Sequence, residues 1–263
     1  MESIGFIGAG RMGFALAKGI RGRFPDTVVH VADPKPERVE LFRREFGAVQ
    51  VHAEARGVAE KAAVVFLAVK PQDCASVLPG LARTGALLIS IVAGLSIARL
   101  EQALPQARVV RVMPNTGCLV GEMAAGYAFG RRVSPADGAA VRRLLDCVGR
   151  SVRVEEELLD AVTAVSGSGP AFVARLVQAF IEAGDRLSLP RPTARELVLQ
   201  TFRGTARLLQ ETGMEPEELV AMVSSPSGTT EAGRAVLEAS DLKEVIFRTV
   251  EAAARRSREL AGS

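Results

Sequence analysis

The chain has 263 residues, of which 48% are hydrophobic and 24% charged, and its formal net charge is +3. That length is enough to bury an ordinary core as one large domain or two smaller ones. Basic residues are scattered, and with no Trp and a single Tyr there are no aromatic platforms for base stacking. We therefore do not expect nucleic-acid binding.

The three cysteines, Cys74, Cys118 and Cys147, are odd in number and widely spaced. They match neither a disulfide framework nor a metal site, which favours a reducing compartment. The apolar run near the N-terminus is short and has no basic region before it, so neither a signal peptide nor a membrane span is expected. We predict a cytoplasmic protein without a bound metal, in which His30 and His52 are structural.

The first part of the chain alternates β-rich runs with helical periodicity. Strands are expected at 3–8, 27–32, 48–52, 63–69, 86–92 and 108–113, with helices at 11–22, 36–46 and 72–81 between them. Two further edge strands, 125–130 and 151–154, flank a helix at 135–148. This alternation is typical of parallel βαβ units with helices on both faces of the sheet. It predicts an α/β fold, with a Rossmann-type doubly wound sheet over residues 1–155.

After about Glu155 the strand-like runs disappear and helical periodicity continues to the end of the chain. Turn-forming residues interrupt it at 167–170, 189–192, 213–216 and 224–228. We therefore predict an all-helical C-terminal domain over residues 156–263. This two-part plan suits a dinucleotide enzyme whose second domain supplies the substrate site.

A glycine-rich turn follows the first expected strand. In "IGFIGAGRMG", Gly8, Gly10 and Gly13 form a GxGxxG pattern between a strand and a helix, the context that the dinucleotide fingerprint requires. The three glycines would allow the tight turn, the approach of a pyrophosphate to the backbone, and close packing of helix on strand. The helix N-terminus would attract the phosphates. The alternative is a glycine turn without a ligand.

Asp33 ends the second expected strand, at the usual distance from the glycines. A carboxylate there would accept hydrogen bonds from the adenosine ribose and repel a 2′-phosphate, which favours NADH. Lys35 lies two residues further on, where it would attract such a phosphate instead. The choice between NADH and NADPH therefore stays open.

Three more loops follow the later expected strands, at the edge of the sheet where this fold binds ligands. They read "AVKPQ" (68–72), "SIVAG" (90–94) and "VMPNTG" (112–117). Pro71 and Pro114 are also ordinary loop residues. Lys70 is more informative, because it is one of only five lysines and stands at a strand end facing the expected cofactor cleft.

These motifs, together with "AVTAVSGSGPAF" (161–172) and "VSSPSGTTEAG" (223–233), resemble the pyrroline-5-carboxylate reductase family in order and spacing along essentially the whole chain. The resemblance implies reduction of the C=N bond of 1-pyrroline-5-carboxylate to L-proline by NADPH or NADH, the last step of proline biosynthesis. It implies cofactor-binding residues at Gly8, Ala9, Gly10, Arg11, Met12, Gly13, Asp33, Lys35, Ala68, Val69, Lys70, Pro71, Ala93, Gly94 and Asn115. It implies substrate binding by Ser168, Ser225, Gly228, Thr229 and Thr230, with Thr230 catalytic.

Two of these motifs also have simpler interpretations. Taken in isolation, the stretch 223–233 is an ordinary helix start, with Thr229 or Thr230 near the N-cap. The segment 166–172 predicts a kink or broken turn, which would bring small side chains near the nicotinamide or pack helices closely at a dimer interface. The chain departs from the family at Gly117, where a proline is usual, at Ser227, where a glycine is usual, and at Ala55, where many members have asparagine.

Two other function classes compete with the reductase. A β-hydroxyacid dehydrogenase has a similar two-domain plan but uses a lysine on the first helix after the boundary, and no lysine lies between Glu155 and Asp241. A cofactor-binding regulator without turnover would have a damaged substrate loop, yet Ser225, Thr229 and Thr230 are present. For assembly, the resemblance implies a homodimer through the C-terminal domain and allows a decamer of five dimers.

Overall fold

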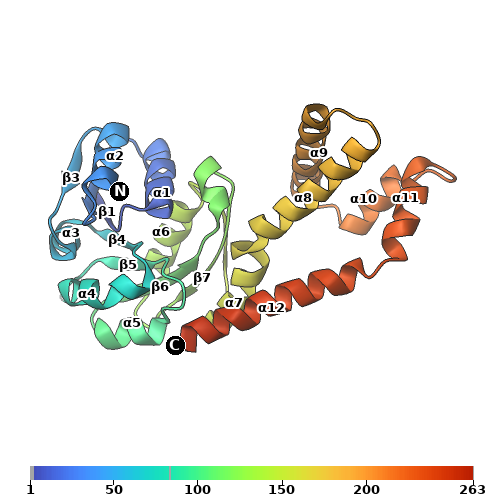
Figure 1. The fold of residues 1–263 in the computed structure, drawn as a ribbon. Coiled ribbons are helices and arrows are strands. Elements are labelled where there is room, and N and C mark those ends of the chain that lie inside the picture. The colour runs from blue at the N-terminus through green and yellow to red at the C-terminus, as the bar shows by residue number, and fades with distance from the viewer. Residues whose placement is uncertain (1–2, 83, 263) are drawn as a thin grey trace. The chain divides into compact units, whose positions relative to one another are not determined.

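A computed structural model describes residues 3–82 and 84–262 (Figure 1). The chain forms two compact units. The first unit consists of the residues up to Pro170 together with those from Ala252 onward. The second unit consists of Ala171–Glu251. The sheet ends at Arg153, close to the boundary predicted near Glu155, whereas the units divide after Pro170.

The first unit is built on one sheet, with the strand order β3-β2-β1-β4-β5-β6-β7-β8 in the described residues. Its strands are β1 Ser3–Ile7, β2 Val28–Ala32, β3 Val49–Val51, β4 Val64–Leu67, β5 Leu87–Ser90, β6 Arg108–Met113, β7 Met123–Phe129 and β8 Gly149–Arg153. The strands from β3 to β6 are parallel, β7 runs antiparallel to β6, and β8 is parallel to β7. The order reverses between β1 and β4, which is where a doubly wound sheet binds its ligand.

One strand prediction was wrong in position. The segment 125–130 was expected as an edge strand, but β7 starts at Met123 and pairs with β6 on one side and β8 on the other. Its Met123, Ala125 and Tyr127 are buried. Periodicity along one strand does not report which strands lie beside it, so the error concerns pairing and not the strand itself.

Helices cover both faces of the sheet, as expected for a doubly wound fold (Figure 1). The helices α1 Arg11–Arg23, α2 Pro36–Phe46 and α6 Pro135–Leu145 bury apolar side chains with one core, in which the Phe6 and Phe66 rings stack 5.0 Å apart. The helices α3 Ala55–Lys61, α4 Cys74–Val77 and α5 Ile97–Ala103 pack on a second core that contains Leu67, Leu88 and Leu100.

The helix expected over 72–81 is broken into three short pieces. A 3₁₀ turn at Pro71–Asp73 leads into α4, and a second 3₁₀ turn at Leu78–Leu81 follows it. Pro71 and Pro79 stand at the start of the two turns, where a missing N–H group is tolerated. The prolines therefore divide a segment that apolar periodicity alone predicts as continuous.

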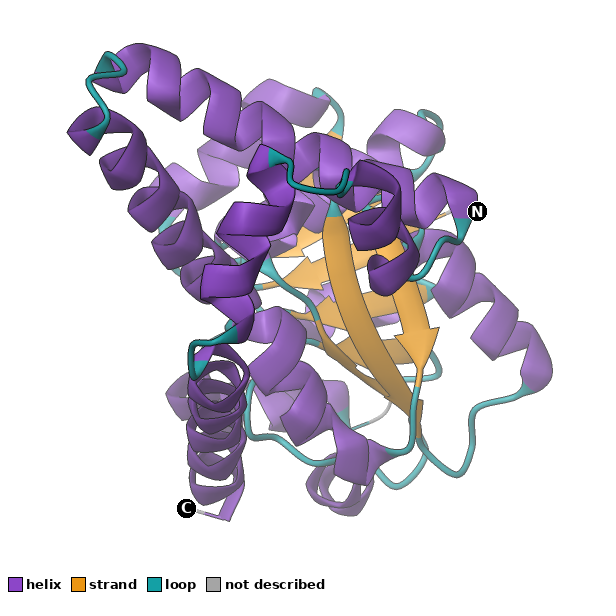
Figure 2. Ribbon diagram, turned by 90° about the vertical axis from the view of Figure 1, so that its right-hand side faces the viewer, coloured by secondary structure: helices purple, strands orange, loops and turns teal. Residues whose placement is uncertain are grey.

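After β8 the described chain contains helices and no strands (Figure 2). A 3₁₀ turn Glu156–Leu158, α7 Leu159–Val162 and a π-helical turn Thr163–Gly167 lead into α8 Gly169–Arg186, α9 Arg191–Thr212, α10 Pro216–Val223, α11 Thr229–Glu238 and α12 Leu242–Gly262. The four predicted interruptions are confirmed. A fifth, at 239–241, was not predicted.

Candidate active site

The glycine loop between β1 and α1 has the geometry that the sequence pattern predicts. Gly8 has φ +95°, and a Cβ added there would come within 2.6 Å of the Ala68 carbonyl oxygen. A Cβ at Gly13 would meet the Gly8 carbonyl oxygen at 2.7 Å, whereas one at Gly10 would meet no atom within 4 Å. Gly8 and Gly13 are therefore needed for the turn and its packing, and Gly10 leaves open space above the backbone.

The N-terminus of α1 is open beside this loop. Gly10 is the N-cap and provides no side-chain cap, and Phe14 is the first residue whose N–H group bonds back, to the Gly10 carbonyl at 2.9 Å. Within the described residues the N–H groups of Arg11 and Met12 have no acceptor, so they and the helix dipole are available to an anion. The Arg11 side chain is exposed, whereas Met12 is packed against the core.

The Asp33 carboxylate is buried and bonded to the backbone on both sides of it. Its carboxylate accepts hydrogen bonds from the N–H groups of Ala9, at 2.7 Å, and Lys35, at 2.9 Å, and its side chain is only 2% exposed. The bond expected between Asp33 and an adenosine ribose stays a prediction. In this structure Asp33 holds the glycine loop against the end of β2.

The loops after β4 and β5 lie together at the carboxyl edge of the sheet, as predicted. Pro71 lines a cavity of about 360 Å³ with Ala93 and Gly94. Gly94 has φ +75°, a conformation that favours glycine. Lys70 is exposed, and the half-buried Ala68 and Val69 precede it.

Asn115 links three segments. Its Oδ1 accepts hydrogen bonds from the N–H groups of Gly117 and Ala124, both at 3.1 Å, and its Nδ2 donates to the Ser166 carbonyl at 3.1 Å. The side chain therefore ties the end of β6 to β7 and to the π-helical turn. This arrangement makes Asn115 a positioning residue in this structure, and the cofactor contact expected from the motif stays a prediction.

The predicted irregularity at 166–172 is confirmed. The chain makes a π-helical turn, in which the Ser168 N–H group donates to the Thr163 carbonyl at 2.7 Å, and α8 begins at Gly169. A Cβ at Gly167 would lie 2.7 Å from Cε of Met113, the end of a flexible side chain. Ser168 lines a cavity of about 190 Å³ together with Ala93 and Gly94. The structure thus brings a predicted substrate residue beside a predicted cofactor loop.

An ion pair on the wall of this cavity was not predicted. Arg111 on β6 bonds the Glu156 carboxylate at 3.0 Å, and the same oxygen accepts from the Ile97 N–H group at 2.8 Å. Their side chains are 12% and 26% exposed. The pair fixes the start of α5, just after Gly94, to the segment after β8. The available sequence signal was a charged residue in the apolar strand "RVVRVM", which requires a buried partner.

In the second unit, the stretch that precedes α11 forms a tight turn around Ser225 and Gly228. The Gly228 N–H group donates to the Ser225 carbonyl at 3.0 Å, and a Cβ at Gly228 would meet the Ser225 Oγ at 2.4 Å. Gly228 is the N-cap of α11, and Thr229 and Thr230 lie near it, as the sequence predicts. The two threonines are the first and second residues of the helix, and both are exposed.

The first turn of α11 has free backbone donors. Ala232 is the first residue to bond back, to the Gly228 carbonyl at 3.2 Å, and within the described chain the N–H groups of Thr229, Thr230 and Glu231 have no acceptor. The Glu231 carboxylate accepts from the Ser227 N–H group at 2.6 Å, a contact that was not predicted. An acid three residues after an N-cap is a helix-start signal that would have indicated it.

Ser227 adopts a left-handed backbone conformation, with φ +58°. A non-glycine residue there is strained, so Ser227→Gly is expected to raise the free energy of unfolding by about 0.5–1 kcal/mol. Ser188→Gly, at φ +65°, should give a similar gain, whereas Ser225→Gly, where φ is negative, should lower stability. Denaturant unfolding measures all three, and a loss of stability in Ser227→Gly would contradict the proposed strain.

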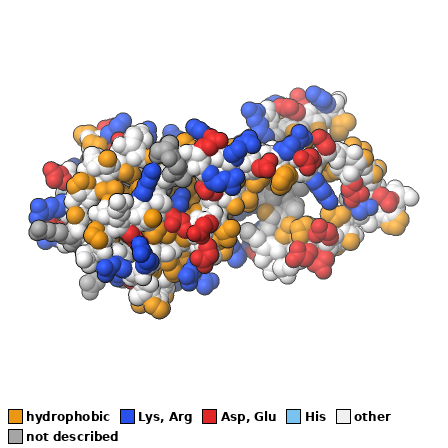
Figure 3. Space-filling view, turned by 90° about the horizontal axis from the view of Figure 1, so that it is seen from below, with side chains coloured by type: hydrophobic (Ala, Val, Ile, Leu, Met, Phe, Trp, Pro, Cys, Tyr) orange, Lys and Arg blue, Asp and Glu red, His pale blue; other side chains and the backbone are white. Residues whose placement is uncertain are grey.

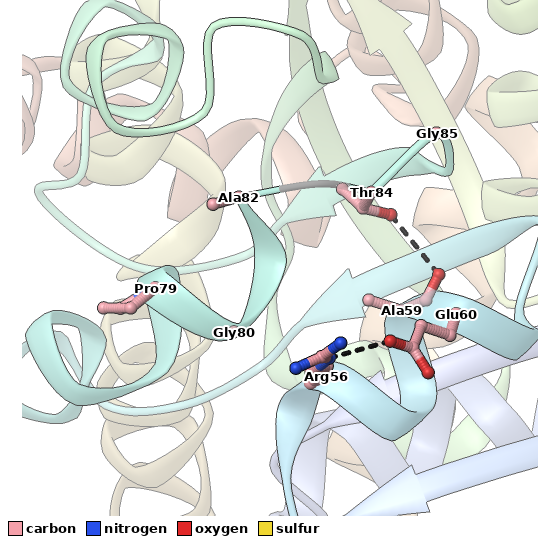
Figure 4. A pocket seen from close by; sticks show the side chains of 8 residues that line it. All are labelled: Arg56, Ala59, Glu60, Pro79, Gly80, Ala82, Thr84 and Gly85. Carbon is pink, nitrogen blue, oxygen red and sulfur yellow. Dashed lines mark hydrogen bonds and ion pairs between the residues drawn. The ribbon is translucent and has the colours of Figure 1, made fainter.

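Another cavity, of about 380 Å³, lies between α3 and the segment that leads into β5 (Figure 4). Its polar groups bond to each other. Arg56 Nε pairs with Glu60 at 2.8 Å, and the Thr84 hydroxyl donates to the Ala59 carbonyl at 3.4 Å. None of the predicted site residues lines it, so we do not assign it to the active site.

Known proteins are similar to this chain along almost its whole length. The family model described as pyrroline-5-carboxylate reductase dimerisation matches residues 156–260, and one described as NADP oxidoreductase, coenzyme F420-dependent, matches residues 3–94. A pyrroline-5-carboxylate reductase of Corynebacterium melassecola is 40% identical, with 99% of each chain covered. One of Synechocystis is 40% identical, covering 98% of this chain and 97% of the relative.

Solved structures of pyrroline-5-carboxylate reductases are also similar to this chain. The reductase of Coxiella burnetii has a TM-score of 0.92 at 32% identity, with 98% of each chain covered. The Plasmodium falciparum enzyme, solved with NADP bound, has a TM-score of 0.84 at 30% identity and covers 99% of this chain and 98% of its own. The chain belongs to the pyrroline-5-carboxylate reductase family.

Proposed function

We propose that this chain reduces the C=N bond of 1-pyrroline-5-carboxylate to give L-proline, with NADPH or NADH as the hydride donor, the last step of proline biosynthesis. The main support for this proposal is the start of α11, where backbone N–H groups have no acceptor in the described chain. The motif that forms this helix start is absent from generic dinucleotide enzymes. Family membership along almost the whole chain supports the same reaction.

The residues of the first unit fit a dinucleotide. The N–H groups at the start of α1 would hold the pyrophosphate over Gly10, where no side chain intrudes. Ala68, Val69, Lys70 and Pro71, with Ala93 and Gly94, would line the remaining cofactor cleft. When bound, the nicotinamide supplies the hydride, and the protein contributes orientation and closeness of the reactants.

The helix start of α11 would bind the substrate carboxylate. Three adjacent N–H groups without acceptors and the positive end of the helix dipole suit a small anion, without a buried arginine. The Glu231 carboxylate accepts a hydrogen bond from the Ser227 N–H group, outside the first turn of the helix. Ser225 and Thr229 add hydroxyl groups that can donate to the same anion.

Thr230 is the proposed catalytic residue. Its hydroxyl would donate a hydrogen bond to the lone pair of the neutral ring nitrogen as the neighbouring carbon accepts hydride. A proton from solvent would then complete the amine. Ser168 would also contact the substrate. It follows the π-helical turn, which Asn115 holds through the Ser166 carbonyl.

A turnover assay separates this function from its two alternatives. Consumption of NADPH or NADH with 1-pyrroline-5-carboxylate, and not with 3-hydroxy acids plus the oxidised cofactor, supports the reductase. The reverse pattern would indicate a β-hydroxyacid dehydrogenase. Dinucleotide binding without turnover of either substrate class would indicate a regulator.

Assembly through the second unit is part of the proposal. In residues 171–251 only Ile181 and Ala194 are buried, so this unit has almost no core of its own. On α8, Val173 and Phe180 are 48% and 54% exposed, and apolar side chains are uncovered on the face shown in Figure 3. A region with so little buried surface needs a partner. We propose a homodimer through this unit, with a decamer of five dimers as the larger assembly.

The expected result in light scattering at micromolar concentration is a dimer or a larger species. Val173→Lys should shift the protein toward monomer, because it places a charge on the uncovered apolar face of α8. Gln178→Lys is the matched control, since Gln178 bonds Arg175 and Glu182 on the polar face. A monodisperse wild-type monomer would contradict the proposal.

A membrane is the alternative partner for the exposed apolar side chains of α8. The stretch Glu156–Arg186 is long and apolar enough, by length and composition alone, to cross a membrane, and 11% of its most apolar window is buried. The dimerisation model of the family covers this stretch, which supports a protein partner in place of lipid.

We place the protein in the cytoplasm, where its free cysteines Cys74, Cys118 and Cys147 suit a reducing compartment.

A further inference from the structure

Asp33 stands where an acid normally selects NADH, but its carboxylate is buried. Besides the N–H groups of Ala9 and Lys35, the Asp33 carboxylate has Arg38 Nη1 at 3.3 Å, and its side chain is 2% exposed. A carboxylate that binds the ribose 2′-hydroxyl must present an oxygen atom to the ligand. Asp33 presents none, and the Arg38 guanidinium offsets its charge. Its repulsion of a 2′-phosphate is therefore weak.

Two cations follow the end of β2, Lys35 and Arg38. Lys35 is the N-cap of α2 and is exposed, and the Arg38 side chain, one turn into the helix, is 38% exposed. They follow Ala32, which pairs with Ile7 at the end of β1, so they flank the glycine loop at the carboxyl edge of the sheet. The acid in this first turn, Glu37, is also exposed, whereas Asp33 is buried, so the charge presented to solvent by these residues is positive by one.

We propose that this chain is selective for NADPH, with Lys35 and Arg38 as the residues that bind the 2′-phosphate. The inference rests on the proposed function, since it concerns the same cofactor. A phosphate monoester carries nearly two negative charges at neutral pH, and a guanidinium fork bonds two of its oxygens at once. Asp33 acts as a positioning residue that holds Arg38 and the loop.

The expected difference is large enough to measure by binding alone. One charge-assisted hydrogen bond of about 1.5–3 kcal/mol corresponds to roughly 10- to 150-fold in the dissociation constant. NADPH should therefore bind at least about tenfold more tightly than NADH. This preference should shrink as salt is added, because the two cations are exposed.

The test uses nucleotide fragments that lack nicotinamide, so it does not depend on turnover. By calorimetry, 2′,5′-ADP should bind the wild-type protein at least about tenfold more tightly than 5′-AMP. Lys35→Gln should weaken only 2′,5′-ADP, since its contact with Asp33 is made by the backbone N–H group. Lys35→Gln with Arg38→Gln should remove most of the difference. Arg44→Gln, in the last turn of α2, is the matched control and should change neither.

Asp33→Ser distinguishes the two roles of the acid. If Asp33 positions the loop and Arg38, this variant should bind both fragments more weakly and should unfold at a lower temperature. An equal affinity of the wild-type protein for the two fragments would overturn the proposal. So would an Asp33→Ser variant that keeps its stability and gains affinity for 2′,5′-ADP alone. A protein that prefers 2′,5′-ADP but does not turn over the imine would leave this inference standing and refute the reductase.

Discussion

Thr230→Ala is expected to lower kcat/KM for 1-pyrroline-5-carboxylate by roughly 10- to 150-fold, the effect of losing a hydrogen bond worth about 1.5–3 kcal/mol in the transition state. Thr230 is the second residue of α11, beside N–H groups that have no acceptor in the described chain. Steady-state kinetics measures the loss. Binding of NADPH alone should stay near the wild-type value, because the hydroxyl has no part in holding the dinucleotide.

Two variants make this prediction specific. Thr230→Ser should recover part of the activity, since the hydroxyl returns without the methyl group that restricts its rotamer. Thr201→Ala should behave as wild type, because that hydroxyl only bonds the Leu197 carbonyl within α9. Wild-type turnover by Thr230→Ala would show that another donor, such as Ser225, serves the ring nitrogen.

Gly117→Pro, which restores the residue that is usual in the family, is expected to destabilise this chain by about 3 kcal/mol or more. The Gly117 N–H group donates to the Asn115 Oδ1 at 3.1 Å, and proline has no such group. A Cβ at this position would also come within 2.2 Å of the Glu122 carbonyl oxygen. The turn after β6 is therefore built around glycine, and the substitution loses a bond and creates a clash.

Chemical denaturation measures this effect directly. Gly22→Ala provides the control, because Gly22 lies inside α1 with no atom within 4 Å of an added Cβ. That variant should gain up to about 1 kcal/mol from better helix propensity. If Gly117→Pro were as stable as the wild-type protein, the turn would have to rearrange, and the position of Asn115 against Ser166 would need a different explanation.

The parts of the fold that depend on local pattern were predictable from the sequence. The parallel strands through β6 and the glycine loop follow from periodicity and from a motif whose geometry each glycine enforces. The helical interruption at 166–172 follows from its glycines and proline. These features rest on residues close together in the chain, so they are visible without any knowledge of tertiary contacts.

What the sequence did not predict depends on contacts between distant segments. Asp33 stands at the expected place in the motif, but its orientation is decided by the Ala9 N–H group, across the loop. The roles of Asn115 and Glu156 likewise depend on partners that the fold brings to them. A residue's type indicates the bonds it can make, and the tertiary structure decides with which partner.

The central claim, that this chain is a pyrroline-5-carboxylate reductase, is tested most directly by product stoichiometry. Purified protein is mixed with 1-pyrroline-5-carboxylate and a limiting amount of NADPH, and L-proline is quantified against the NADPH consumed. We predict equimolar amounts of L-proline formed and NADPH consumed. Failure to consume NADPH, or consumption without L-proline, would contradict the assignment.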